Sequence, residues 1–168
     1  MTYDKNNIFA KILRGEIPCK KIYEDEYVLA FHDINPQKKV HALVIPKGEY
    51  VNLDDFSSKA SEKEIVGLIK GIGTVAKKLG VSEVVKGKGY RSLVNVGENG
   101  GQEVPHLHFH IFGGERVGKM IFDKNSLELK GWETNDAYSN KVNFEINNLI
   151  INNQILDDFF KIPQEKDL

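Results

Sequence analysis

Three histidines alternate with apolar residues in one short segment, and this alternation constrains the fold more than any other feature of the chain. Residues 105–112 read Pro-His-Leu-His-Phe-His-Ile-Phe, which places His106, His108 and His110 at every second position. Alternate side chains of an extended strand lie on the same face. The segment therefore predicts a strand with three imidazoles on one face and the intervening apolar side chains on a core face.

This histidine strand is also where we expect the function, because it holds three of the five histidines of the chain. A shared tetrahedral metal is disfavoured, since the Cα atoms of His106 and His110 would lie about 13 Å apart along a strand. A metal would need a further ligand from His32, His41 or a nearby acid. A serine nucleophile is also disfavoured, because no Gly-x-Ser-x-Gly turn is present. Nucleophilic attack by an imidazole on phosphorus remains as the third possibility.

A glycine-rich loop precedes the histidine strand and favours the phosphorus chemistry. Residues 97–102 read Gly-Glu-Asn-Gly-Gly-Gln. Such glycines permit backbone conformations in which several N–H groups converge on an anion, and Asn95 adds a side-chain amide. Loop and strand together predict a phosphate-binding site.

The composition limits the partners and the location of the protein. The formal net charge is −1, from 23 basic and 24 acidic residues, so we expect no nucleic-acid or membrane partner. A polar N-terminus and the absence of a long apolar run predict a cytoplasmic protein. The one cysteine, Cys19, excludes an internal disulfide.

The remaining pattern predicts an α+β fold. A short helix is expected within residues 7–17, and strands at residues 20–24, 27–32 and 41–46, followed by a core strand at residues 90–96. The clearest helix runs over residues 61–79, where a Ser-x-x-Glu capping box at Ser61 precedes an apolar stripe of helical period and Gly80 ends it. Short connections between the strands favour a mostly antiparallel sheet.

The C-terminal part differs in character from the rest. We expect a domain over residues 1–120 and an extension over residues 121–168, docked on the domain or on a dimer. Within the extension, residues 142–146 alternate like a strand, whereas a terminal helix is the other interpretation. The apolar face of that helix would consist of Ile146, Leu149, Ile150, Leu156 and Phe160.

The motif His-x-His-x-His resembles the signature of the histidine triad nucleotide-binding proteins. Four further segments resemble the nucleoside phosphoramidase branch of that family in the same order, and the resemblance covers about residues 7–120. These segments are residues 7–18, 31–36, 41–47 and 95–102.

The resemblance implies an α+β subunit with a five-stranded, mostly antiparallel sheet, a short N-terminal helix and one long helix, pairing into a homodimer with a continuous sheet. It also implies hydrolysis of the phosphorus–nitrogen bond of purine nucleoside phosphoramidates, without a metal or cofactor. The alternatives are hydrolysis of dinucleoside polyphosphates, nucleotidyl transfer, or a catalytically weak module that binds nucleotides or another protein.

The same resemblance assigns roles to individual residues. His108 would be the nucleophile, His106 would lie beside the phosphate and leaving group, and His41 and His110 would orient the nucleophile. With His32 in the nucleoside pocket, all five histidines would serve one site. The implied nucleotide-binding residues are Ile8, Phe9, Ile17, Phe31, His32, Asp33, Ile34, Leu43, Asn95, Gly101, Glu103 and Val104.

Overall fold

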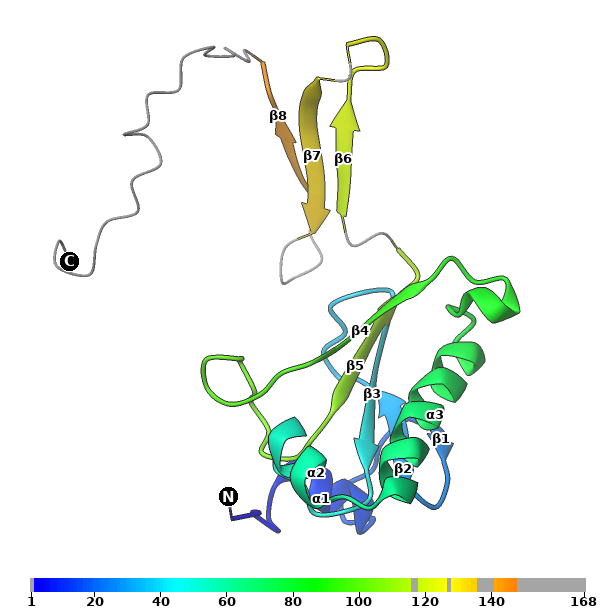
Figure 1. Ribbon diagram of the computed structural model, residues 1–168, viewed down its shortest axis with the longest axis vertical. Coiled ribbons are helices and arrows are strands. Elements are labelled where there is room, and N and C mark those ends of the chain that lie inside the picture. Colours follow the sequence, from blue (N-terminus) through cyan, green and yellow to red (C-terminus); the bar gives the residue numbers. More distant parts are fainter. Residues whose placement is uncertain (1, 116–117, 127, 136–140, 148–168) are drawn as a thin grey trace, which may run out of the picture. The chain divides into compact units, whose positions relative to one another are not determined.

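The chain forms two compact units (Figure 1). The computed structural model describes residues 2–115, 118–126, 128–135 and 141–147. Residues 2–115 belong to the first unit, and the described residues from 118 onward belong to the second.

A five-stranded antiparallel sheet forms the centre of the first unit. Together with three helices, one of them long, it confirms the predicted α+β class. The strands follow the order β1 (Lys21–Glu24), β2 (Val28–His32), β3 (Val40–Pro46), β5 (Phe109–Gly113) and β4 (Tyr90–Val94) across the sheet.

Each face of this sheet carries its own apolar core, because successive strand residues point to opposite faces. On one face, Val28 and Ala30 pack with residues of α2 (Leu53–Lys59) and α3 (Glu62–Lys78). On the other, Leu29 and Phe31 pack with Phe9 of α1 (Ile8–Leu13). Among the described helices, none combines the length and apolar character needed to cross a membrane.

The long helix α3 begins and ends where its sequence signals predict. The Glu64 backbone N–H donates to Ser61 Oγ, and the Ser61 N–H donates to Glu64 Oε2 at 2.9 Å, which completes the capping box. After the last turn, Gly80 takes a φ of +70°, a conformation that glycine adopts without a Cβ clash.

Close packing of α3 against β2 depends on glycines. A Cβ at Gly71 would lie 2.7 Å from Cγ2 of the fully buried Val28, whereas a Cβ at Gly73 would meet no atom within 4 Å. Gly71→Ala is therefore expected to lower the free energy of unfolding by about 1–3 kcal/mol. Gly73→Ala, the matched control in the same helix, should raise it by about 0.5–1 kcal/mol. Urea unfolding measures both, and equal effects of the two substitutions would contradict this account of the packing.

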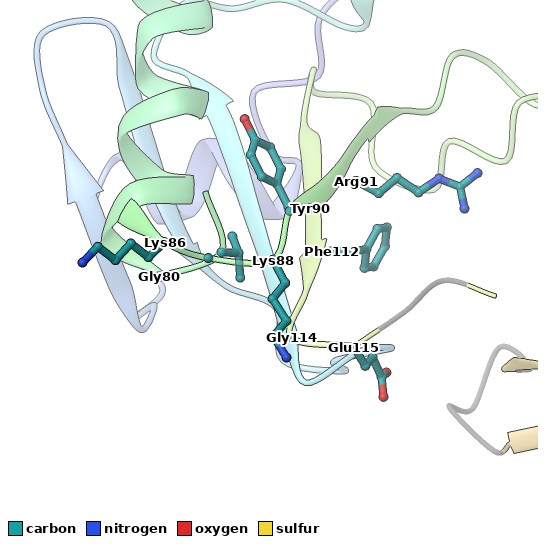
Figure 2. A pocket seen from close by; sticks show the side chains of 11 residues that line it. Gly80, Lys86, Lys88, Tyr90, Arg91, Phe112, Gly114 and Glu115 are labelled. Carbon is teal, nitrogen blue, oxygen red and sulfur yellow. The ribbon is translucent and has the colours of Figure 1, made fainter. Parts of the chain in front are cut away.

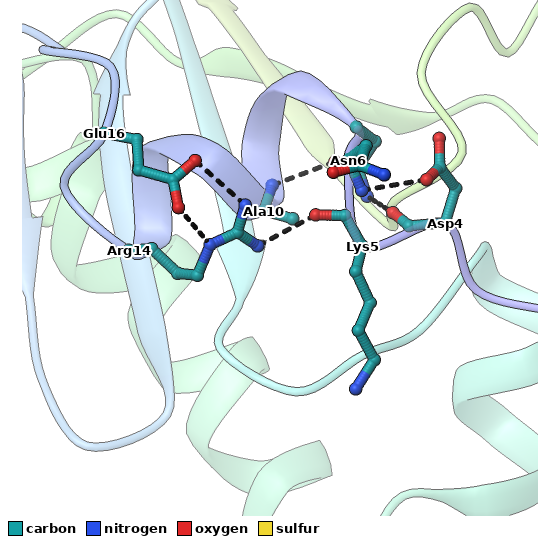
Figure 3. Close-up of polar contacts among 7 residues, drawn as sticks. Asp4, Lys5, Asn6, Ala10, Arg14 and Glu16 are labelled. Carbon is teal, nitrogen blue, oxygen red and sulfur yellow. Dashed lines mark hydrogen bonds and ion pairs between the residues drawn. The ribbon is translucent and has the colours of Figure 1, made fainter.

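The segment before α1 is held by local polar contacts (Figure 3). The Arg14 guanidinium donates to the Lys5 carbonyl at 2.8 Å and to both carboxylate oxygens of Glu16 at 2.6 and 3.0 Å. Asn7 caps α1 by accepting from the Ala10 N–H at 2.9 Å. These contacts fix the chain on either side of Phe9, which reaches the histidine segment.

Two features of the first unit differ from the sequence prediction. The strand expected to be in the core, β4, is instead an edge strand that ends at Val94, and its first three residues are exposed. Helix α2 was not predicted, although Asn52 and the acidic residues that follow it are N-terminal helix signals; Asn52 Oδ1 accepts from the Asp55 N–H at 3.0 Å. A 3₁₀ turn (Glu83–Val85) follows α3.

The second unit contains a three-stranded antiparallel sheet of β6 (Gly118–Phe122), β7 (Leu129–Asn135) and β8 (Lys141–Glu145). Strand β8 agrees with the strand interpretation of residues 142–146. Leu149, Ile150, Leu156 and Phe160 of the alternative helix lie outside the described residues. Trp132 and Phe144 are cross-strand neighbours whose rings stack with centroids 4.8 Å apart.

Candidate active site

Only the C-terminal part of the histidine segment joins the sheet, which corrects the prediction of one strand from residue 105 to residue 112. Pro105 has no N–H, and residues 106–108 precede β5. The His106 N–H donates to the Val104 carbonyl at 2.8 Å, and the Leu107 N–H donates to the Tyr50 carbonyl at 2.8 Å. The alternation of faces is nevertheless present, because Leu107 is buried in the core on the α3 side.

The ring of His108 has one defined tautomer. Its Nδ1 lies 2.7 Å from the His106 carbonyl oxygen, which can only accept a hydrogen bond. Nδ1 therefore carries the proton, and Nε2 has a free lone pair. The Phe9 ring packs edge-on against the imidazole, with centroids 5.1 Å apart, and fixes its orientation.

His106 is a buried structural residue rather than a lining residue of the cavity. Its ring is fully buried, and its Nε2 donates to the Pro46 carbonyl at 3.0 Å. The other nitrogen, Nδ1, is therefore bare and accepts from the Tyr3 hydroxyl. Both ring nitrogens thus have partners within the fold, which differs from the expected position beside the phosphate.

A second pair of rings lies next to His108. His41 Nε2 and His110 Nδ1 are 2.9 Å apart, and the Gln37 N–H approaches His41 Nδ1 at 3.3 Å. Because a backbone N–H can only donate, His41 Nε2 carries the proton and donates to His110. Neutral His110 then has its own proton on Nε2, where it can donate to a ligand. The Asp33 carboxylate lies 3.5 Å from His41 Nε2.

Burial keeps these imidazoles neutral. Burial lowers the pKa of His106 to about 4, and burial together with the neighbouring rings of His108 and His41 lowers the pKa of His110 to about 4. Burial also lowers the pKa of His108, against the opposing effect of the His106 carbonyl. The pKa of His41 is lowered by burial and raised by the Asp33 carboxylate, with a net lowering. A neutral His108 is the form that can act as a nucleophile.

Three potential metal-binding groups also meet here. The ligand atoms of Asp33, His41 and His110 lie within 4.8 Å of one another. The hydrogen bond between the two facing ring nitrogens accounts for the closeness of the two histidines. These contacts give no separate reason to place a metal at the site.

A cavity of about 390 Å³ opens beside His108. One wall is apolar, and it includes side chains that are exposed at the mouth, with Ile34 86% exposed and Ile8 42% exposed. The apolar lining residues are Ile8, Phe9, Ile12, Phe31, Ile34, Leu43 and Val104. The polar lining residues are Asp33, Asn35, Gln37, His41, Asn95, Gly101, Glu103, His108 and His110.

Most of the predicted site residues therefore line one cavity, and three do not. His106 lies behind the cavity, and Ile17 is absent from its lining. His32 follows Val28 and Ala30 in the alternation along β2, so it lies on the α3 side, opposite Phe31. The five histidines thus do not share one site. Three further lining residues, Ile12, Asn35 and Gln37, were not predicted from the sequence. Of these, only Ile12 could have been recognised, because it belongs to the apolar stripe of the first helix.

The glycine-rich loop forms the polar rim of the cavity. Gln102 organises it, since its Oε1 accepts from the Gly97 N–H at 3.1 Å and its Nε2 donates to the Val51 carbonyl at 2.7 Å. Gly97 and Gly101 have φ values of +66° and +71°, which explains why glycine is used at both turns. The Asn95 amide donates to the Gly101 carbonyl at 3.5 Å.

A larger cavity of about 720 Å³ lies elsewhere on the first unit (Figure 2). Its lining includes Lys86, Lys88, Arg91 and Tyr90 and none of the histidines. Although it is larger, its lining contains no imidazole, whereas His108 has a bare Nε2 beside the smaller cavity. The cavity beside His108 is therefore the candidate active site.

Comparison with known proteins identifies the family of the chain. A family model described as the HIT domain matches residues 14–117. A HIT-like protein of Azospirillum brasilense is 61% identical over 120 residues, which cover 71% of this chain and 95% of that protein. The purine nucleoside phosphoramidase of Escherichia coli K12 is 39% identical over 120 residues, which cover 71% of this chain and 97% of that protein.

Solved structures of the same family are also similar to this chain. A histidine triad protein from Clostridium difficile has a TM-score of 0.60 and 42% identity, covering 69% of this chain and 96% of its own. A HIT family hydrolase from Clostridium thermocellum has a TM-score of 0.60 and 38% identity, covering 71% of this chain and 99% of its own. The chain therefore belongs to the HIT domain family.

Proposed function

We propose that this protein hydrolyses the phosphorus–nitrogen bond of purine nucleoside phosphoramidates through a covalent nucleotidyl intermediate on His108. The observation that carries the proposal is the hydrogen bond from His108 Nδ1 to the His106 carbonyl, which leaves Nε2 bare beside the cavity. The similarity to the purine nucleoside phosphoramidase of Escherichia coli supports the same substrate class.

In the proposed binding mode, the purine, the ribose and the phosphoryl group follow one another along the cavity. The apolar wall formed by Phe9, Phe31 and Ile34 suits the faces of a purine. At the end of that wall, the Asp33 carboxylate suits the ribose hydroxyls. Asn95 and the loop around Gly101 then meet the phosphoryl oxygens with N–H donors.

In the first step, His108 Nε2 attacks phosphorus while the phosphorus–nitrogen bond breaks and its electron pair stays on nitrogen. A proton from solvent reaches that nitrogen in the same step, so the leaving group is a neutral amine. The imidazole gains positive charge as the new bond forms, so the Nδ1–H bond to the His106 carbonyl becomes charge-assisted and stronger. His110 Nε2–H is available to donate to a phosphoryl oxygen as charge develops there.

In the second step, water attacks phosphorus and breaks the bond to His108, which restores the free imidazole. Over the whole cycle one water is consumed. Its oxygen ends on the nucleoside monophosphate and its two protons end on the amine, which is an ammonium ion at neutral pH.

The charge of the cavity favours phosphoramidates over dinucleoside polyphosphates. Its described lining contains two carboxylates, Asp33 and Glu103, and no lysine or arginine. A polyphosphate leaving group carries several negative charges with no cation here to neutralise them. We expect kcat/KM for adenosine 5′-phosphoramidate to exceed that for diadenosine tetraphosphate by about 100-fold or more. A preference for the polyphosphate would contradict the proposal.

A homodimer joined through the edge strand β4 is part of this proposal. Among the described strands, β4 pairs only with β5, and Tyr90 at its start is 39% exposed. An unpaired edge of this kind favours pairing with a second strand. Analytical ultracentrifugation should give twice the chain mass of 19.0 kDa at micromolar concentration. A monomer mass under those conditions would refute the dimer and leave the chemistry of His108 untouched.

A further inference from the structure

Glu103 is a charged residue of the cavity that the steps above do not use. Glu103 lines the same cavity as His108, and its carboxylate lies close enough to act on His108 electrostatically. Among the described residues, no group hydrogen-bonds or ion-pairs with this carboxylate. The other carboxylate of the lining, Asp33, is already engaged, since it accepts from the Asn35 N–H at 2.7 Å and lies beside His41.

The described lining of the cavity provides no cation that could balance the Glu103 carboxylate. No lysine or arginine is present in the described lining, and burial keeps the neighbouring imidazoles neutral. At neutral pH this end of the cavity therefore has an unbalanced negative potential, screened only by water.

The phosphoryl oxygens, the purine and the amine of a bound phosphoramidate differ in how they interact with a negative potential. The phosphoryl oxygens are negative and repel a carboxylate, and the purine belongs to the apolar wall. Only the amine side of the phosphorus–nitrogen bond offers N–H donors and gains positive charge as it leaves. The ribose hydroxyls also donate hydrogen bonds, but the proposed substrate position pairs them with Asp33. By elimination, the leaving amine is the part of the substrate that Glu103 can face favourably.

We propose that Glu103 selects phosphoramidates whose leaving amine carries an additional positive charge, such as a diamine that is linked to phosphorus through only one of its two nitrogens. It rejects phosphoramidates whose leaving amine carries a negatively charged group. This inference rests on the proposed function. The carboxylate attracts the cationic group in the bound substrate and stabilises the ammonium ion that departs. Glu103 thereby determines specificity without forming a bond to phosphorus.

Three adenosine 5′-phosphoramidates of similar length test the proposal. They are made from putrescine, pentylamine and δ-aminovaleric acid, so that the amine ends in an ammonium, a methyl or a carboxylate group. For the wild-type protein, kcat/KM should fall in that order, with about three- to tenfold between successive members at low salt. Added salt should reduce the differences.

Substitutions then locate the effect. Glu103→Gln should reduce the ratio between the putrescine and δ-aminovaleric acid compounds by about tenfold, and Glu103→Lys should reverse the order. Glu98→Gln, which removes another exposed carboxylate from the same loop, is the matched control and should leave the ratio unchanged.

The outcomes separate this proposal from the one on which it rests. Equal turnover of all three compounds, or an unchanged ratio in Glu103→Gln, overturns the selection by Glu103 while phosphoramidase activity stands. Failure to cleave any of the three compounds, including the neutral pentylamine derivative, overturns the proposed function and this inference with it.

Discussion

Replacing His108 by alanine should lower kcat/KM for adenosine 5′-phosphoramidate by about 10⁴-fold or more. The substitution removes the bare Nε2 that forms the bond to phosphorus, and no other ring in the cavity offers one. His106 is enclosed by Pro46 and Tyr3, and His110 Nδ1 accepts from His41. The affinity for adenosine monophosphate should change by no more than a few fold, because Phe9 and Phe31 still form the apolar wall.

Turnover of the phosphoramidate, measured by release of the monophosphate, checks this result. Mass spectrometry of the wild-type protein quenched during turnover should find the nucleotidyl group on His108. His32→Ala is the matched control, since His32 lies on the opposite face of the sheet and should leave kcat/KM within about twofold. Undiminished turnover in His108→Ala would refute covalent catalysis by this residue.

The parts of the fold that depend on local signals could be predicted from the sequence. Helix α3 begins at its capping box and ends before Gly80, because both signals act within one turn of the helix. The position of β4 at the sheet edge could not be predicted in this way. It depends on which strands pair across the sheet, and strand length and composition do not encode that order.

The candidate site likewise has features that depend on local sequence and features that depend on distant residues. Alternation predicted correctly that the three imidazoles share one side of the segment. It could not distinguish their roles, because the burial of His106 depends on the Tyr3 hydroxyl and the Pro46 carbonyl, which are far away in the sequence. His32 is absent from the cavity lining because β2 turns its side chain toward the α3 side, and this depends on how β2 is placed between the two cores.

The tautomers of the histidines could be assigned only from the tertiary structure. The nucleophilic nitrogen of His108 is defined by a backbone carbonyl, and the proton of His41 is defined by a backbone N–H. No residue type identifies such partners, since every residue except proline offers the same two backbone groups. Chemical roles within a histidine cluster therefore follow from the path of the main chain.

The buried histidines make a second large effect predictable, in the dependence of stability on pH. The pKa of His106 falls from an ordinary value of about 6.5 when unfolded to about 4 when folded. Below about pH 6.5 the unfolded chain binds a proton that the folded protein excludes, so stability is lost as the pH falls toward 4. From about pH 7.5 to about pH 5 this one group should lower the free energy of unfolding by about 2 kcal/mol. The lowered pKa values of His41, His108 and His110 act in the same direction.

Urea unfolding across this pH range measures the effect. Between about pH 7.5 and about pH 5 the histidines dominate the change in stability. Carboxylates with a lowered pKa, such as Glu24 with a pKa of about 2, lose their stabilising contribution only when the pH falls below the ordinary pKa of a carboxylate. His106→Gln retains a donor for the Pro46 carbonyl and an acceptor for the Tyr3 hydroxyl but does not titrate. Between about pH 6 and about pH 5, the free energy of unfolding of this variant should fall by about 1.2 kcal/mol less than that of the wild-type protein. An equal slope in the two proteins would mean that His106 takes up its proton in the folded state, and it would contradict the lowering of the His106 pKa by burial.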